Sequence, residues 1–213
     1  MNVKTLVLSP LDTNCYIVSA ENGEAVVIDP ADDGEKILSA AGAAGLEIKK
    51  ILLTHGHFDH IGAAEYIKEQ TGAPIYIHRA DEVLLSDPVK ALAFFCPGKP
   101  FVSCKPDVLF DDGDVIEQGA LRFTVMSTPG HTAGSVCFLC SDGSGKDVMF
   151  AGDTLFKDSI GRSDGYSGDQ QEQFRSLDRL KALDKDYIVY PGHGESTTLD
   201  AEKRYNPFLA GII

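Results

Sequence analysis

The chain has 213 residues, a formal net charge of −13, 43% hydrophobic residues and 24% charged residues. These proportions are ordinary for a globular protein, and the length suits one domain over residues 1–213 with a substantial buried core. The acidic balance argues against general binding to nucleic acid or to an anionic membrane, and no apolar run approaches the ~20 residues needed to span a bilayer.

The first third of the chain alternates short β-branched runs with turns. Strands are predicted over residues 5–10, 14–20 and 25–30, with Asn22-Gly23 at a hairpin turn between the second and the third. A helix is predicted over 34–44. A buried strand over 49–54 follows, then a histidine-rich segment, and then a helix over Ala63–Gln70 that stops at Gly72.

The middle of the chain contains an aromatic segment that is expected to be a loop. Residues 73–78 are predicted to form a strand and residues 79–87 a short helix. Residues 88–106 then contain four prolines and three phenylalanines. Long loops of this kind are uncommon unless they are functional, so this loop is predicted to act as a lid over a site.

The second half repeats the same style. A strand, a turn and a strand are predicted over 107–131, a hairpin turns at Asp142–Lys146, a helix covers about 170–183, and a strand covers 186–193. Strands meeting helices in both halves predict an α/β sandwich.

The cysteines are predicted to be reduced and structural. There are five, an odd number, and they form no dense framework, as expected for the reducing cytosol. Cys137 and Cys140 spell C-x-x-C, but residues three apart on a strand point to opposite faces, so inert core thiols are predicted. Cys96 and Cys104 flank a short loop, and the sequence leaves open whether their side chains meet across a turn. The N-terminal segment has no signal-peptide pattern, so we expect a cytoplasmic protein.

Three of the six histidines fall within the segment THGHFDH, residues 54–60. Alternate residues of an extended segment share a face, so His55, His57 and Asp59 can point the same way. A helix that starts near Asp59 then brings His60 beside them, and Gly56 allows backbone geometry that a β-carbon would hinder. Four ligating side chains from six residues are more than one tetrahedral ion can use comfortably.

Three later strand ends supply similar groups: His131 in STPGH, Asp153 in VMFAGD and His193 in YPGH. Sites in α/β proteins lie at such junctions. Seven imidazole and carboxylate ligands without a thiolate predict two divalent ions with positions open to water, with zinc favoured and iron or manganese as alternatives. The purely structural alternative is that each of these histidines and aspartates is a turn residue or a hydrogen-bonded polar group. The remaining histidine, His78, is interpreted as a strand-end residue that packs against or caps nearby backbone.

The motif THGHFDH, followed in order by PGHTAGS, AGDTLF and PGHGE, resembles the metallo-β-lactamase superfamily. The resemblance extends from NCYIV to NPF and implies a four-layer αββα sandwich with the site at one edge. It also implies the distribution of ligands between the ions. One metal would take His55, His57 and His131, the second would take Asp59, His60 and His193, and Asp153 with a hydroxide would bridge both. Asp29 matches a strand-end aspartate that braces the metal-binding loop.

Within that superfamily, the segment GDTLFKDSIGRSD resembles the glyoxalase II-like hydrolases, in a short form that lacks their C-terminal helical domain. The resemblance implies hydrolysis of a small anionic thioester of the hydroxyacylglutathione type. The metal-bridging hydroxide would attack the carbonyl, with Asp59 as the catalytic residue that orients it. Arg162 and Lys157 are the candidate substrate-binding residues, and pairing of Arg162 with Asp164 is the alternative. Asp164 and Glu195 replace an aromatic residue and a tyrosine of that group.

The rival interpretation is an iron-dependent persulfide dioxygenase of the same fold, which shares the histidine motif and a similar GR-S/T-D segment. Ser135 in PGHTAGS is more typical of the hydrolases. Processing of nucleic acid is disfavoured by the acidic charge. A binding module without catalysis is disfavoured because every ligand position is filled, and a lactamase is disfavoured because no secretion signal is seen.

Overall fold

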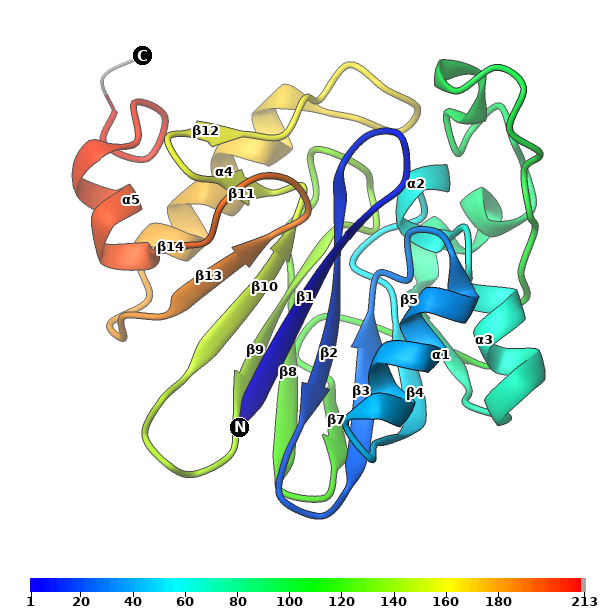
Figure 1. The fold of residues 1–213 in the computed structure, drawn as a ribbon. Helices are drawn as coiled ribbons and strands as arrows, with labels where there is room; N and C mark the ends of the chain where they lie inside the picture. The colour runs from blue at the N-terminus through cyan, green and yellow to red at the C-terminus, as the bar shows by residue number, and fades with distance from the viewer. Residues whose placement is uncertain (212–213) are drawn as a thin grey trace.

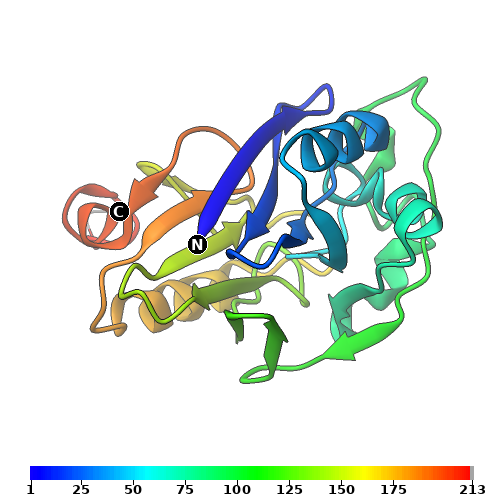
Figure 2. The ribbon, with the colours of Figure 1, turned by 60° about the horizontal axis from the view of Figure 1, so that its bottom comes forward.

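The computed structural model describes residues 1–211, and the last two residues of the expected 1–213 domain lie outside the described part. Two six-stranded β-sheets face each other, with helices on their outer faces (Figure 1 and Figure 2). The architecture is the four-layer αββα sandwich that the resemblance implied.

The first sheet has the spatial order β1 to β6. Its strands are β1 (Asn2–Leu8), β2 (Thr13–Ser19), β3 (Glu24–Ile28), β4 (Glu47–Leu52), β5 (Ile75–His78) and β6 (Val108–Phe110). The first three pair in antiparallel fashion, and β3 to β6 pair in parallel. Parallel neighbours need a crossover, and α1 (Gly34–Ala43) and α3 (Ala64–Thr71) lie in two of these connections.

The second sheet has the spatial order β14-β13-β10-β9-β8-β7. Its strands are β7 (Val115–Gln118), β8 (Leu121–Ser127), β9 (Val136–Ser141), β10 (Val148–Gly152), β13 (Ile188–Pro191) and β14 (Thr197–Thr198). Only β10 and β13 pair in parallel, and α4 (Gln170–Lys181) lies in the connection between them. Strands β11 (Leu155–Phe156) and β12 (Ser159–Ile160) form a separate small hairpin.

Alternation along the strands divides the apolar residues among three cores. On β2, Tyr16 and Val18 belong to the core between the sheets, whereas Ile17 belongs to the core beneath α1 and α3. The same alternation separates the two cysteines of the C-x-x-C motif. Cys140 lies in the inter-sheet core and Cys137 in the core beneath α4, both as free buried thiols, which confirms that they form no common clamp. Cys96 and Cys104 are also free thiols.

Several elements differ from the sequence-based expectation. The helix predicted over 79–87 is a 3-10 helix, η1 (Arg79–Leu85), and its Asp81 points into the protein to bind backbone amides. The region 107–131 contains three strands instead of two. Helix α5 (Leu199–Tyr205) was not expected, although Thr198 caps it and acidic residues precede basic ones along it, both of which are ordinary signals of a helix.

The predicted loop 88–106 contains only one short 3-10 turn, η2 (Ala93–Phe95). His78 caps η1 by accepting a hydrogen bond from the amide of Ala80, which confirms the bland interpretation of this histidine. Within residues 1–211, no helix has the length and apolar character required to cross a membrane.

Candidate metal centre

All seven predicted ligand residues meet at one end of the sandwich. His55 and His57 follow β4, Asp59 and His60 lie on the four-residue helix α2 (Phe58–Ile61), His131 follows β8, Asp153 follows β10, and His193 follows β13. The first sheet and its following helix therefore supply four residues and the second sheet supplies three. His193 is the most accessible of these histidines, and the others are buried.

The ligand atoms fall into two groups, each with its members within 4.8 Å of one another. One group is His55, His57 and His131, and the other is Asp59, His60 and His193. The carboxylate of Asp153 lies between the groups. Its Oδ1 is 3.4 Å from Nε2 of His60, and its Oδ2 is 3.4 Å from Nε2 of His131 and 3.5 Å from Nε2 of His193.

These spacings match the edges of a metal coordination polyhedron. In a tetrahedron of ligands at zinc bond lengths of 2.0–2.2 Å, neighbouring ligand atoms lie about 3.4 Å apart. The carboxylate of Asp59 keeps the same spacing in the second group, with Oδ2 at 3.5 Å from Nε2 of His60 and 3.4 Å from Nε2 of His193. Hydrogen-bonded partners would lie closer, at about 2.7–3.2 Å.

Five of the converging atoms have no hydrogen-bond partner within the described chain. They are Nε2 of His55, His57, His60 and His131, together with Oδ1 of Asp153. A buried polar atom without a partner costs about 1–3 kcal/mol, so five in one place require an external partner. A divalent cation satisfies imidazole nitrogens and carboxylate oxygens together, so this donor set fits metal ions.

Hydrogen bonds on the far side of three rings aim the Nε2 atoms inward. Nδ1 of His131 lies 2.7 Å from the carbonyl oxygen of Arg162, and Nδ1 of His193 lies 3.1 Å from that of Leu11. Each carbonyl accepts only if Nδ1 carries the hydrogen, which leaves Nε2 free to ligate. Nδ1 of His60 similarly faces Oδ2 of Asp29 at 2.9 Å. Such outer contacts fix the tautomer and the ring orientation of metal-binding histidines.

Asp29 acts as a brace. Its carboxylate accepts hydrogen bonds from the amide of Thr54 at 2.8 Å and from the hydroxyl of Thr54 at 2.6 Å, in addition to facing His60. Asp29, His55 and His60 also form a tight group of potential ligand atoms. Because both carboxylate oxygens of Asp29 are already engaged, we interpret it as a support for the histidine segment, as expected.

Strand β2 contributes two supports that sequence interpretation missed. The hydroxyl of Thr13 donates to Oδ2 of Asp59 at 2.8 Å, and the side-chain amide of Asn14 donates to the carbonyls of Pro191 and Gly194 on either side of His193. These contacts join the N-terminal hairpin to ligand segments that are distant in sequence, so no local pattern identifies them.

Asp81 is a third missed residue, and it joins two ligand segments. This buried carboxylate accepts hydrogen bonds from the amide of Gly56 at 3.0 Å, the hydroxyl of Thr132 at 2.7 Å and the amide of Gly134 at 2.7 Å. Burial raises the pKa of Asp81, and the three donors oppose that rise. Asp81 therefore links the segment of His55 and His57 to the segment of His131.

We expect Asp81→Asn to lower the free energy of unfolding by about 1–3 kcal/mol, because an amide NH2 group would face a backbone donor. Metal affinity should fall roughly 10- to 100-fold, as for other supports of metal ligands. Chemical denaturation and metal titration measure the two effects. The matched control is Glu82→Gln on the exposed neighbour. An Asp81→Asn protein as stable as that control would contradict the proposed link.

Without bound cations, the pKa values of the clustered histidines shift in opposite directions. Burial, followed by repulsion from His131, lowers the pKa of His57 to about 3. Burial also disfavours charge on His60 and His193, but neighbouring carboxylates outweigh it and raise their pKa values to about 9 and about 11. Burial opposes ionisation of Asp59, yet His60 and His193 lower its pKa to about 2.

Metal uptake should therefore release protons. At pH 7 the raised pKa values keep His60 and His193 protonated, whereas ligation through Nε2 needs the neutral ring, so about two protons should leave when metal binds. Lower pH should weaken binding, because each proton must then be displaced against a higher proton concentration. Calorimetry in two buffers with different ionisation enthalpies measures the release. A heat that is identical in both buffers would contradict it.

A cavity of about 300 Å³ opens onto the cluster. Its lining residues are Leu11, His57, Phe58, Asp59, Leu92, Phe95, His131, Asp153, Arg162 and His193. Loop 88–106 thus supplies part of the wall, and the amide of Phe58 donates to the carbonyl of Ala91 at 3.0 Å. The structure places the predicted lid beside the cluster, and its closure stays a prediction.

The two candidate substrate-binding residues are both paired with carboxylates. Lys157 contacts Glu195 at 2.6 Å and does not line the cavity. Arg162 lines the cavity, and its Nε and Nη2 atoms donate to the two carboxylate oxygens of Asp164 at 2.6 and 3.0 Å. Of the two, only Arg162 is placed to meet a substrate.

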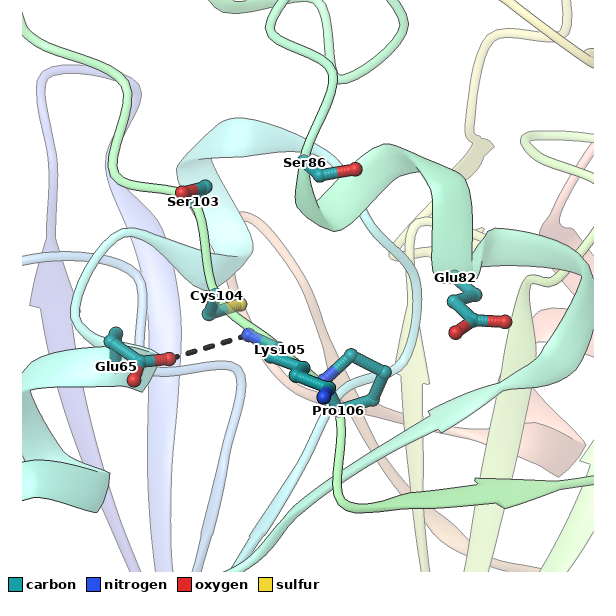
Figure 3. A pocket seen from close by; sticks show the side chains of 7 residues that line it. All are labelled: Glu65, Glu82, Ser86, Ser103, Cys104, Lys105 and Pro106. Atoms are coloured by element: carbon teal, nitrogen blue, oxygen red, sulfur yellow. Dashed lines mark hydrogen bonds between the residues drawn. The ribbon is translucent and has the colours of Figure 1, made fainter.

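A larger hollow of about 460 Å³ lies elsewhere, between α3, η1 and residues 103–106. Figure 3 shows its walls, where the backbone amide of Lys105 donates to the carboxylate of Glu65. None of the seven converging residues lines it. Size therefore does not identify the chemically equipped cavity, and the smaller one is the candidate site.

Comparison with known proteins identifies the family and the fold. The sequence pattern of the metallo-beta-lactamase superfamily matches residues 8–193. The hydroxyacylglutathione hydrolase GloC of Haemophilus influenzae is 34% identical over 213 residues, covering 98% of each chain.

Two solved structures share the whole fold. The B3 metallo-beta-lactamase BLEG-1 superposes with a TM-score of 0.91 and 36% identity, over 99% of this chain and 100% of that one. TTHA1623 in a di-iron-bound form superposes with a TM-score of 0.85 and 38% identity, over 97% and 100%.

Proposed function

The chain belongs to the metallo-β-lactamase superfamily, and from this premise we propose that it hydrolyses small thioesters with the help of two divalent metal ions. The observation that carries the proposal is the set of buried, unpartnered ligand atoms at coordination spacing beside an open cavity. The thioester class is supported by the relationship to GloC. We propose residues 1–213 as a single catalytic domain.

We propose that His55, His57 and His131 hold one ion, that Asp59, His60 and His193 hold the other, and that Asp153 contacts both. The two ligand groups and the central position of Asp153 support this assignment. When bound, such ions lower the pKa of water and polarise a carbonyl group. Zinc is the favoured metal, and the di-iron form of TTHA1623 supports iron as the alternative.

The protein's own groups position the reactants. Asp59 is ionised at neutral pH, since its pKa is about 2, and Thr13 holds its carboxylate in place, so Asp59 can accept a hydrogen bond from the attacking water and orient it. The apolar side chains of Leu11, Leu92 and Phe95 flank the cavity and shelter the acyl group. A thiolate leaves readily, so no strong acid is required of the chain.

The first test is hydrolysis of S-lactoylglutathione by the zinc-loaded protein. Turnover that depends on metal and disappears on chelation supports the proposal. The relationship to BLEG-1 makes β-lactam hydrolysis the competing activity, so a chromogenic cephalosporin is assayed in parallel. Turnover of the cephalosporin alone, or oxygen uptake by an iron-loaded sample with glutathione persulfide, would replace thioester hydrolysis by another reaction.

A further inference from the structure

The arginine at the candidate site is already paired within the chain. Among the described residues that line the cavity, Arg162 is the only arginine or lysine. Its fork makes two hydrogen bonds to Asp164, and its guanidinium carbon lies 5.2 Å from the ring centroid of Phe95. One edge of the guanidinium therefore faces a carboxylate of the chain, and one face covers an aromatic ring.

A substrate carboxylate gains little from an arginine in this state. To bind Arg162 bidentately it must displace Asp164, so one carboxylate contact is exchanged for another. The displaced Asp164 lies only two residues away and would repel the incoming anion. The side chains of the pair are 53% and 72% exposed, so solvent further limits what the exchange can contribute.

Apart from Arg162 and the proposed metal ligands, the cavity lining is apolar. Leu11, Leu92 and Phe95 line the cavity, and Leu11 and Phe95 are 43% and 49% exposed. A second stacked pair, Lys90 over the ring of Tyr166 at 5.2 Å, also connects loop 88–106 to the segment after Arg162. Because Arg162 and Lys90 are both stacked on aromatic rings, the surface offered by Leu11, Leu92 and Phe95 is apolar. Such a surface favours a substrate whose thiol carrier is uncharged.

We propose that Asp164 is a specificity-determining residue that disfavours thioesters with an anionic thiol carrier and leaves uncharged thioesters as the preferred substrates. The inference rests on the proposed thioester hydrolysis and deepens it. It departs from the expectation of an anionic substrate because the two candidate basic residues are paired within the chain. Asp164 acts through Arg162, so it is a positioning residue.

The test compares two substrates with one acyl group, S-lactoylglutathione and the lactoyl thioester of N-acetylcysteamine. In Asp164→Asn, the KM for the glutathione thioester should fall about fivefold, the change expected when one exposed ion pair becomes available. The kcat for the glutathione thioester should stay constant. The KM and kcat for the uncharged thioester should also stay constant. The gain should vanish in the double variant Arg162→Gln/Asp164→Asn.

Glu117→Gln is the matched control, because Glu117 forms an equally exposed pair with Arg122, at 2.8 Å, and does not line the cavity. It removes the same unit of charge and should change neither substrate's KM. Equal changes for both substrates in Asp164→Asn, or no change, would overturn the inference.

Failure of the proposed function is recognised separately, as an absence of turnover of both thioesters by the metal-loaded wild-type protein. Calorimetric binding of glutathione itself then decides the inference. Tighter binding to Asp164→Asn than to wild type and to Glu117→Gln supports it. Equal binding, or no binding to any of the three proteins, overturns it.

Discussion

Asp59→Ala is expected to lower thioester turnover at least about 100-fold while the protein still folds. Asp59 is proposed both to ligate an ion and to orient the attacking water, so its removal affects binding and catalysis together. The fold should survive because the side chain of Asp59, on the four-residue helix α2, belongs to none of the apolar clusters.

Metal content separates the two proposed roles of Asp59. Thr13→Val keeps the carboxylate but removes the hydroxyl that donates to it, so it should lose roughly 10-fold in metal affinity or activity. Thr13→Ser retains the hydroxyl and serves as the matched control. Normal turnover by Asp59→Ala with a full complement of metal would show that Asp59 has neither role.

Gly192→Ala is expected to disrupt the centre without touching a ligand. A Cβ atom at this position would lie 2.1 Å from Oδ1 of Asp153 and 2.8 Å from Cε1 of His60. The backbone cannot easily retreat, because the amide of Gly192 donates to Gly152 and its carbonyl accepts from Asn14, both at 2.7 Å. The carboxylate and the imidazole must therefore move from their positions.

The loss should appear in metal-dependent stability. If the affinity falls about 100-fold, a metal concentration 1,000 times the wild-type Kd stabilises the variant by about 1.4 kcal/mol instead of about 4.1 kcal/mol. Thermal unfolding with and without metal, together with metal analysis, measures this difference. Gly42→Ala is the control, since its added Cβ would meet no atom within 4 Å beyond its chain neighbours and the backbone of its own helix, and alanine favours a helix. Equal metal stabilisation in both variants would contradict the expected crowding.

The residues that converge on the centre were visible in the sequence because their chemistry is concentrated at the ends of recognisable strands. THGHFDH concentrates imidazole and carboxylate groups at short spacing, each later junction adds one such residue, and the structure brings all seven together. Strands meeting helices in both halves similarly predicted the sandwich, and the alternation of side chains along a strand predicted the separation of Cys137 from Cys140.

The supports were invisible because their partners are distant in sequence. Asp81 sits in RADEVLL, where an acidic residue looks like the first turn of an exposed helix, yet its partners are residues 56, 132 and 134. Thr13 reaches Asp59 from a strand 46 residues earlier. Nothing local distinguishes such residues from ordinary polar ones, because only the packing of the two sheets creates their contacts.

The two groups of ligand atoms also become complete at different times during synthesis. His131 completes the first group, but the second awaits His193, which follows the last long helix of the domain. At about 5–20 residues per second, the ribosome needs roughly 3–12 s to add the intervening segment. A chain cut before β13 still contains every residue of the first group and lacks the histidine of the second. Premature termination or proteolysis there would thus leave at most a one-ion protein.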